Sequence, residues 1–142
     1  MAIFLDSGFF IALYNKLDEN HQAAKKLMEE LLNGAYGKAY TSSFILDEVV
    51  SYSLRKLGLE HSIKIEHIIQ DSGLVDMLPV GDAFFAEAKI FFKKHPSLEL
   101  TLTDWTNISI MLLNGIDMIL SFDSGFDKLI NIKEFAKIRR VH

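Results

Sequence analysis

The chain has 142 residues, the usual length of one folded domain, and 49% of them are hydrophobic, which is enough for a sizeable core. Its net charge of −4 excludes a protein that holds nucleic acid through overall positive charge, so such a function would need bound metal or a local basic face. The absence of cysteine excludes a disulfide scaffold and a cysteine-based zinc site, and it is typical of a reducing cytoplasm.

The first residues reach an acid at Asp6 without a preceding basic segment, which argues against a signal peptide. No apolar run approaches the length that a membrane span requires. We therefore expect a cytoplasmic protein.

Short apolar runs alternate with helical patterns along the whole chain. The apolar runs that predict strands occur at residues 2–5, 38–41, 74–80 and 118–123. The helical patterns occur at residues 9–14, 19–32, 43–57, 60–70, 82–94, 103–114 and 126–130. This alternation predicts an α/β fold in one domain, residues 1–142, with a mostly parallel sheet of four to five strands flanked by helices on both faces.

Individual residues predict where several of these elements begin and end. Asp18 is a candidate N-cap of the second helix, and either Ser42 or Ser43 is a candidate N-cap of the third. Residues 98–102 alternate in polarity and are predicted to be extended. Asn114-Gly115 is typical of the C-terminal end of a helix.

The strand predicted at residues 118–123 delivers a carboxylate to an edge of the sheet. Three apolar residues lead into Ser121, Phe122 and Asp123, and Ser124-Gly125 then breaks the run. Open parallel sheets bind ligands outside the carboxyl ends of their strands, so Asp123 lies where chemistry is expected.

Three further carboxylates follow a similar rule. Asp6 ends the first strand, and Glu48 lies in the first turns of the helix after the second strand. Asp104 opens the sixth helix, and it reaches the same edge if residues 96–102 return across the sheet. Converging carboxylates repel each other and lose hydration, and a divalent cation such as Mg²⁺ or Mn²⁺ relieves both costs. Such a site can bridge to phosphate oxygens and activate water, which would let an acidic protein act on a polyanion.

Each acid also has an ordinary structural explanation when it is taken alone. Asp6 and Asp123 are suitable cap or turn residues, and Asp104 is a suitable acid for a helix N-terminus. Glu48 is a suitable surface residue of a helix. The joint placement of the four acids favours the metal site.

Five short motifs follow one another along nearly the whole chain. They are Ile3–Ser7, Asp18–His21 with Ala24, Thr41–Val49, Leu102–Asp104, and Ile119–Asp123 with Phe126. Each motif is weak alone, but the ordered set resembles the PIN-domain family, and within it the VapC-like toxins of toxin–antitoxin pairs.

The resemblance implies a PIN-like domain in which Asp6, Glu48, Asp104 and Asp123 are the catalytic residues and bind Mg²⁺ or Mn²⁺. It implies a metal-dependent endoribonuclease that hydrolyses RNA phosphodiester bonds and serves as the toxin of a type II toxin–antitoxin pair. It further implies a homodimer, a cognate antitoxin, and a supporting hydrogen bond from Ser121.

Three neighbours of these acids need separate treatment. Ser7 is predicted to cap or position the acid before it. Two roles remain open for Asp127: it either supports the site or contacts the metal, or it is an ordinary surface acid or helix cap. Consecutive helix residues point about 100° apart, so only one of Asp47 and Glu48 should face the site, and the motif favours Glu48.

Other chemically suitable residues are expected to lie outside the site. None of the five histidines forms a spaced metal-binding pair. Trp105 is expected to be half-buried by packing, with stacking on a nucleic-acid base as the alternative. Basic pairs such as Arg139-Arg140 form either a phosphate-binding rim or an ordinary solvated face.

Two other functions compete with the nuclease. A PIN-like module could bind RNA or a partner without turnover, although all four acids are present. A phosphoryl-transfer protein of another α/β family fits less well, because a haloacid-dehalogenase-like phosphatase needs a second Asp two positions after Asp6, where Gly8 stands.

Overall fold

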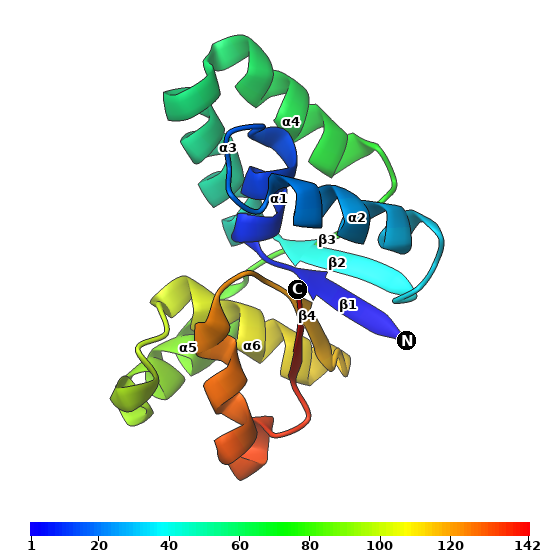
Figure 1. Ribbon diagram of the computed structural model, residues 1–142. Coiled ribbons are helices and arrows are strands. Elements are labelled where there is room, and N and C mark those ends of the chain that lie inside the picture. The colour runs from blue at the N-terminus through cyan, green and yellow to red at the C-terminus, as the bar shows by residue number, and fades with distance from the viewer.

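The structure is a computed structural model that describes all of residues 1–142. Its elements, where η marks a 3-10 helix, are β1 (Ala2–Leu5), α1 (Ser7–Tyr14), α2 (His21–Leu32), β2 (Lys38–Ser42), α3 (Ser43–Leu57), α4 (Leu59–Asp71), β3 (Asp76–Leu78), α5 (Asp82–Lys94), η1 (Pro96–Leu98), α6 (Leu102–Asn114), β4 (Met118–Leu120), η2 (Ser124–Asn131), η3 (Lys133–Phe135) and β5 (Arg139–Val141). Figure 1 shows their arrangement in space.

The five strands form one sheet in the order β3-β2-β1-β4-β5. Every neighbouring pair is parallel, and Phe4 of the central strand β1 lies beside Tyr40 of β2 and Ile119 of β4. The predicted α/β class and the predicted number of strands are confirmed. The carboxyl ends of all five strands therefore share one edge, as expected for parallel strands.

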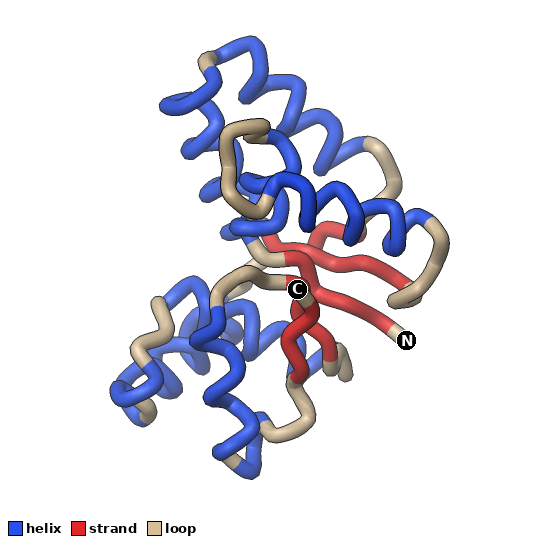
Figure 2. The backbone as a smooth tube through the Cα atoms, viewed as in Figure 1, coloured by secondary structure: helices blue, strands red, loops and turns tan.

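Helices cover both faces of the sheet (Figure 2). On one face α1 contacts α2 and α3, and α3 contacts α4. On the other face α5 contacts α6. No helix combines the length and the apolar character that crossing a membrane would require.

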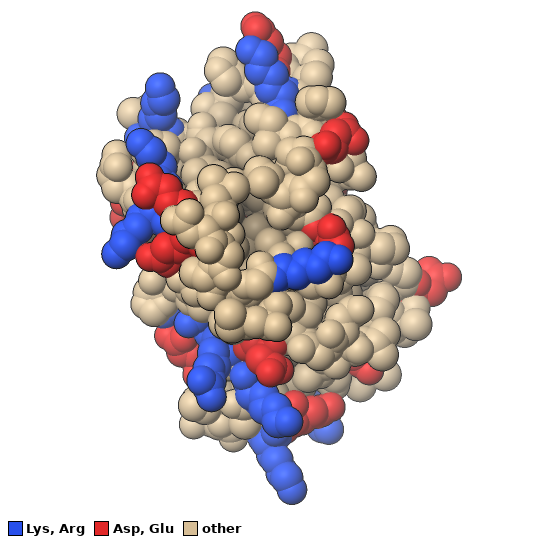
Figure 3. Space-filling model, turned by 90° about the vertical axis from the view of Figure 1, so that its right-hand side faces the viewer, with Lys and Arg blue, Asp and Glu red and all other residues tan.

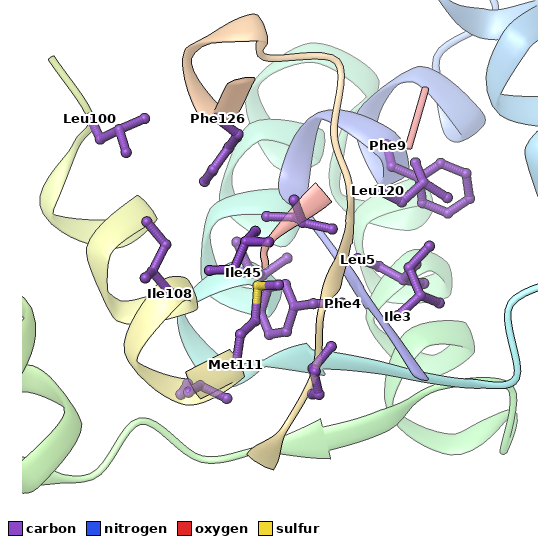
Figure 4. Close-up of a cluster of buried hydrophobic side chains, with 14 of the residues drawn as sticks. Ile3, Phe4, Leu5, Phe9, Ile45, Leu100, Ile108, Met111, Leu120 and Phe126 are labelled. Atoms are coloured by element: carbon purple, nitrogen blue, oxygen red, sulfur yellow. The ribbon is translucent and has the colours of Figure 1, made fainter. Parts of the chain in front are cut away.

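The central strand β1 packs into the core on both sides. Successive side chains of a strand point to opposite faces, so Phe4 points away from Ile3 and Leu5. Figure 4 shows Phe4 beside Met111 of α6, whereas Ile3 and Leu5 lie on the side of Phe9 of α1. All five side chains are at most 1% exposed. This packing fixes the end of β1, where the first predicted acid follows.

The prediction of an extended segment at residues 98–102 is wrong. Pro96–Leu98 forms η1, and Glu99 then adopts a left-handed conformation with φ of 56°. The helix α6 follows at once, with Thr101 as its N-cap. The left-handed residue turns the chain back sharply, which a strand cannot do.

Two other predicted boundaries also need correction. Asp18 does not cap α2, because its carboxylate accepts the Asn20 N–H at 2.8 Å in the preceding turn. The strand predicted at residues 74–80 is confined to three residues, and Pro79, which has no N–H to donate to a ladder, follows it.

Trp105 lies in the core. It is 0% exposed, and its ring centroid lies 5.7 Å from that of Phe91 and 5.5 Å from that of Phe135. His95 stacks on it at 5.7 Å. Trp105 is therefore more deeply buried than the half-buried packing that was predicted, and it is not available to stack on a nucleic-acid base.

Candidate metal centre

Four helices begin along the carboxyl edge of the sheet. Asp6 caps α1 by accepting the Ser7 N–H at 2.8 Å, and Ser42 caps α3. Thr101 caps α6, and Asp123 caps the 3-10 helix η2. Because a helix N-terminus carries partial positive charge, this edge favours carboxylates.

Asp6 lies deepest in this edge and is only 6% exposed. Its Oδ1 accepts the Ser7 N–H at 2.8 Å, and its Oδ2 accepts the Ser121 hydroxyl at 2.7 Å. Burial raises the pKa of Asp6, the two hydrogen bonds oppose that shift, and the charges of Glu48 and Asp123 add to it. A carboxylate in this position gains from the arrival of a cation.

Asp104 reaches the same edge from the opposite face of the sheet. Its Oδ2 accepts the Thr101 N–H at 2.9 Å, while its own N–H donates to Thr101 Oγ1 at 3.1 Å, which makes a capping box. Burial raises the pKa of Asp104 to about 6, and repulsion from Asp6 and Asp123 contributes while hydrogen bonds to Thr101 oppose the shift. The chain before α6 therefore does return to the carboxyl edge of the sheet, which was the condition for Asp104 to lie there.

Glu48 lies in the first turns of α3 and is exposed. Loss of hydration raises the pKa of its carboxyl group, hydrogen bonding to the Ser7 side chain opposes this, and Asp104 and Asp47 add repulsion. Asp47 is also exposed and lies 3.5 Å from the Ser51 hydroxyl. The structure therefore places Glu48, rather than Asp47, beside the other acids.

Asp123 lies just after β4, at the start of η2. Its Oδ1 accepts the Gly125 N–H at 2.8 Å, and its own N–H donates to Ser121 Oγ at 3.1 Å. The Ser121 hydroxyl thus links the backbone of Asp123 to the carboxylate of Asp6. Ser121 is 0% exposed, so this link is shielded from water.

The four predicted acids lie close enough for electrostatic coupling. Asp6 is repelled by Glu48 and Asp123, and Asp104 is repelled by Asp6 and Asp123 and in turn repels Glu48. No three His, Asp or Glu side chains are close enough together to form a ready-made cation cage. The acids form an open cluster that supplies only hard oxygen donors, which suits Mg²⁺ or Mn²⁺ because such ions complete their coordination with water.

Asp127 is engaged by a different partner. Arg140 Nε donates to its Oδ1 at 2.9 Å, and Arg140 Nη2 donates to its Oδ2 at 2.7 Å. This pairing with Arg140 lowers the pKa of Asp127. Sequence reasoning identified Arg140 only as half of a basic pair, because the two residues are 13 positions apart and meet only when β5 joins the sheet.

Two hollows lie outside the acidic cluster. The first has a volume of about 260 Å³ and lies among α1, α2, α4 and the sheet, where 13 of its 18 lining residues are hydrophobic. Figure 3 shows a hollow in a largely uncharged part of one face of the molecule. The second, of about 520 Å³, lies beside the start of α6 and is lined by Phe92, Lys93, His95, Pro96, Glu99, Leu100 and Thr101.

Solved structures with the same architecture include three bacterial proteins. The toxin VapC20 of Mycobacterium tuberculosis, described as cleaving the sarcin-ricin loop, is 25% identical with a TM-score of 0.77 over 86% of this chain and 90% of its own. VapBC2 from Rickettsia felis, solved with a promoter DNA fragment, is 12% identical with a TM-score of 0.65 over 99% of this chain and 98% of its own. FitAcB from Neisseria gonorrhoeae is 15% identical with a TM-score of 0.65 over 99% and 96%. The last two show likeness of fold alone.

Family comparison agrees with the architecture. A search among curated proteins finds no match to this chain. The PIN domain family, in contrast, matches residues 3–131, which include all four acids of the cluster. With this match over nearly its whole length, the chain belongs to the PIN domain family.

Proposed function

We propose that the chain is a divalent-metal-dependent endoribonuclease that hydrolyses RNA phosphodiester bonds, and that it is the toxin of a type II toxin–antitoxin pair. The observation that carries this proposal is the placement of four acids near one sheet edge: Asp6, Asp104 and Asp123 at the starts of α1, α6 and η2, and Glu48 in the second turn of α3. Membership of the PIN family and the likeness to a sarcin-ricin loop cleaving toxin support RNA as the substrate.

The four acids would hold Mg²⁺ or Mn²⁺. A bound cation of this kind polarises phosphate oxygens and lowers the pKa of a bound water. The chain itself orients the ligands: Ser121 fixes the carboxylate of Asp6, and Thr101 fixes that of Asp104. These hydrogen bonds hold the carboxylates in place before any cation binds, which reduces the cost of ordering them.

A bound cation would also explain how a negatively charged chain can bind RNA. A chain with a net charge of −4 repels a polyanion at long range. Cations held by the acidic cluster would reverse that repulsion where the phosphate must approach. The same edge would then bind RNA only in the metal-loaded state.

We further propose a cognate antitoxin as the protein partner and a homodimer as the assembly. The structural neighbours VapBC2 and FitAcB are named as assemblies, which supports a partner protein. The apolar hollow among α1, α2 and α4 offers a surface that a partner side chain can fill. Co-purification of the product of a small neighbouring gene, with light scattering of the chain alone and in complex, tests both parts.

The nuclease proposal is tested by cleavage assays on Asp6→Asn and Asp104→Asn with Mg²⁺ or Mn²⁺. Both changes keep the side-chain shape and remove one charge from the cluster, so cleavage should be lost in each. Asp47→Asn is the matched control, because this exposed acid lies beside Glu48 on the same helix. Wild-type cleavage rates in both test variants would overturn the proposal. Tight RNA binding by the wild type without turnover, across divalent metals, would instead favour a binding module.

A further inference from the structure

We propose that Arg140, held by Asp127, is a positioning residue that fixes the turn from which Ser121 and Asp123 reach the acidic cluster. The inference rests on the proposed function, since it concerns the same site. It assigns the C-terminal strand β5 a part in building that site. It also gives Asp127 a role other than that of a fifth metal ligand.

Arg140 makes three hydrogen bonds with well-defined partners. Its Nε and Nη2 bind the two carboxylate oxygens of Asp127 at 2.9 and 2.7 Å, and its Nη1 donates to the Ser121 carbonyl at 3.3 Å. The Arg140 side chain is only 9% exposed. A planar guanidinium can span a carboxylate and a backbone carbonyl in this way, and a lysine ammonium cannot reproduce that fork.

The contacts continue from Ser121 into the acidic cluster. The Ser121 hydroxyl donates to Asp6 and accepts from the Asp123 N–H, while its carbonyl accepts from Arg140. Arg140 therefore restrains the backbone of Ser121, the residue whose hydroxyl joins Asp6 to Asp123. Asp127, from η2, completes a loop of contacts around the turn after β4.

This geometry argues against two simpler roles for the pair. An exposed ion pair such as Lys38–Asp76, with side chains 60% and 48% exposed, adds little to a fold. Asp127 is 55% exposed, so the Arg140–Asp127 pair differs only through the arginine, whose side chain is 9% exposed and also donates to the Ser121 carbonyl. A phosphate-binding rim would need free donors facing solvent, whereas three of the guanidinium donors are already engaged.

The loss of Arg140 should change the affinity of the cluster for a cation in opposite directions, depending on whether Arg140 acts through its charge or by positioning the ligands. Arg140 lies within electrostatic range of Asp123, so removal of its charge would by itself strengthen cation binding at the cluster. The release of the Asp127 charge would strengthen it further. If Arg140 instead positions the ligands, its removal weakens cation binding despite the more negative surroundings.

The test measures Mn²⁺ affinity by calorimetry in the absence of RNA, together with kcat and KM for RNA cleavage. Arg140→Gln should weaken Mn²⁺ binding about tenfold and lower kcat with little change in KM, the scale seen when partners of metal ligands are removed. Arg140→Lys should fail to restore the affinity, because charge without the fork is insufficient. Arg139→Gln, which removes the same charge from an exposed neighbour, should match the wild type.

The double variant Arg140→Gln with Asp127→Asn keeps the net charge unchanged. It also removes the charge of the half-exposed Asp127, which Arg140→Gln alone leaves without its partner, so it should be at least as stable as Arg140→Gln. It should still bind Mn²⁺ about tenfold more weakly than the wild type, since the positioning contacts are lost. Wild-type or tighter Mn²⁺ binding in this folded double variant overturns the inference. A wild type that neither binds Mn²⁺ nor cleaves RNA overturns the proposed function instead, so the two failures are distinguishable.

Discussion

Asp6 and Glu48 belong to the same acidic cluster but differ in their exposure to solvent. Asp6 is 6% exposed and is held by Ser7 and Ser121, whereas Glu48 is exposed on the surface of α3. Burial makes the charge of Asp6 expensive in the absence of a cation, while water screens much of the charge of Glu48. The buried acid should therefore dominate both the stability of the free protein and its affinity for metal.

Replacement of Asp6 by Asn should give the largest effect and should separate stability from function. Cleavage should fall by at least about a thousandfold, because a metal supplies several kcal/mol of transition-state stabilisation. The metal-free variant should melt above the metal-free wild type by about 2–5 °C at pH 7, because a buried charge among like charges is removed.

Differential scanning fluorimetry with and without Mn²⁺ checks both expectations for Asp6. The wild type should gain stability with Mn²⁺, because a ligand that binds only the folded state stabilises it, and the variant should not. A metal-free variant that melts below the wild type would show that Asp6 serves the fold rather than the cluster.

The exposed acid is tested by the adjacent pair Glu48→Gln and Asp47→Asn. Each removes one charge from neighbouring positions of α3, but only Glu48 is coupled to Asp104. We expect about a hundredfold loss of cleavage for Glu48→Gln, on the scale of about 3 kcal/mol, and none for Asp47→Asn. Steady-state kinetics with Mn²⁺ should show this difference. Equal losses in the two variants would mean that general surface charge, rather than a defined ligand, matters at this position.

Much of this arrangement follows from the sequence through one rule of parallel sheets. Asp6 and Asp123 end apolar runs that became neighbouring strands, so their convergence could be predicted from the order of elements. The prediction that Glu48 belongs to the site followed from its place in the helix after β2. The prediction that Ser121 supports the site followed from the motif around Asp123.

The sequence could not predict the features that depend on tertiary contacts. The predicted route of the chain to Asp104 was an extended segment at residues 98–102, whereas the chain returns through η1 and the left-handed residue Glu99. The pairing of Arg140 with Asp127 depends on where β5 joins the sheet. Local patterns carry no information on such contacts, because the partners lie on different elements.

Ser121→Ala should produce an intermediate effect, because it removes a support from Asp6 and Asp123 without removing a ligand. The loss of the buried hydroxyl leaves one oxygen of Asp6 without its donor. We expect a loss of about 1–3 kcal/mol in the free energy of unfolding, measured by urea denaturation. Mn²⁺ affinity should fall about tenfold, as when partners of metal ligands are removed. Ser51→Ala, which removes a hydroxyl near Asp47, is the control that should leave Mn²⁺ affinity unchanged.

The smallest expected effect is on the pH dependence of stability, and it concerns Asp104, whose exposure lies between those of Asp6 and Glu48. Its pKa is raised from 3.8 to about 6 in the folded chain, so the folded state holds its proton more tightly than the unfolded state does. This contribution to stability is fully present below pH 3.8 and is lost as the pH rises through about 6. Asp6 and Glu48, whose pKa values are also raised, act in the same direction.

Between pH 5 and pH 7.5 the melting temperature of the metal-free wild type should therefore fall more than that of Asp104→Asn, by about 3–5 °C. The comparison between the two proteins cancels the titration of groups that both retain. Saturating Mn²⁺ should remove most of the difference in slope above pH 6, because the cation replaces the proton as the charge that stabilises the cluster. Parallel pH profiles for the two metal-free proteins would mean that Asp104 is hydrated like Glu48 rather than enclosed like Asp6, and the contrast between the buried and the exposed acid would then lose its intermediate member.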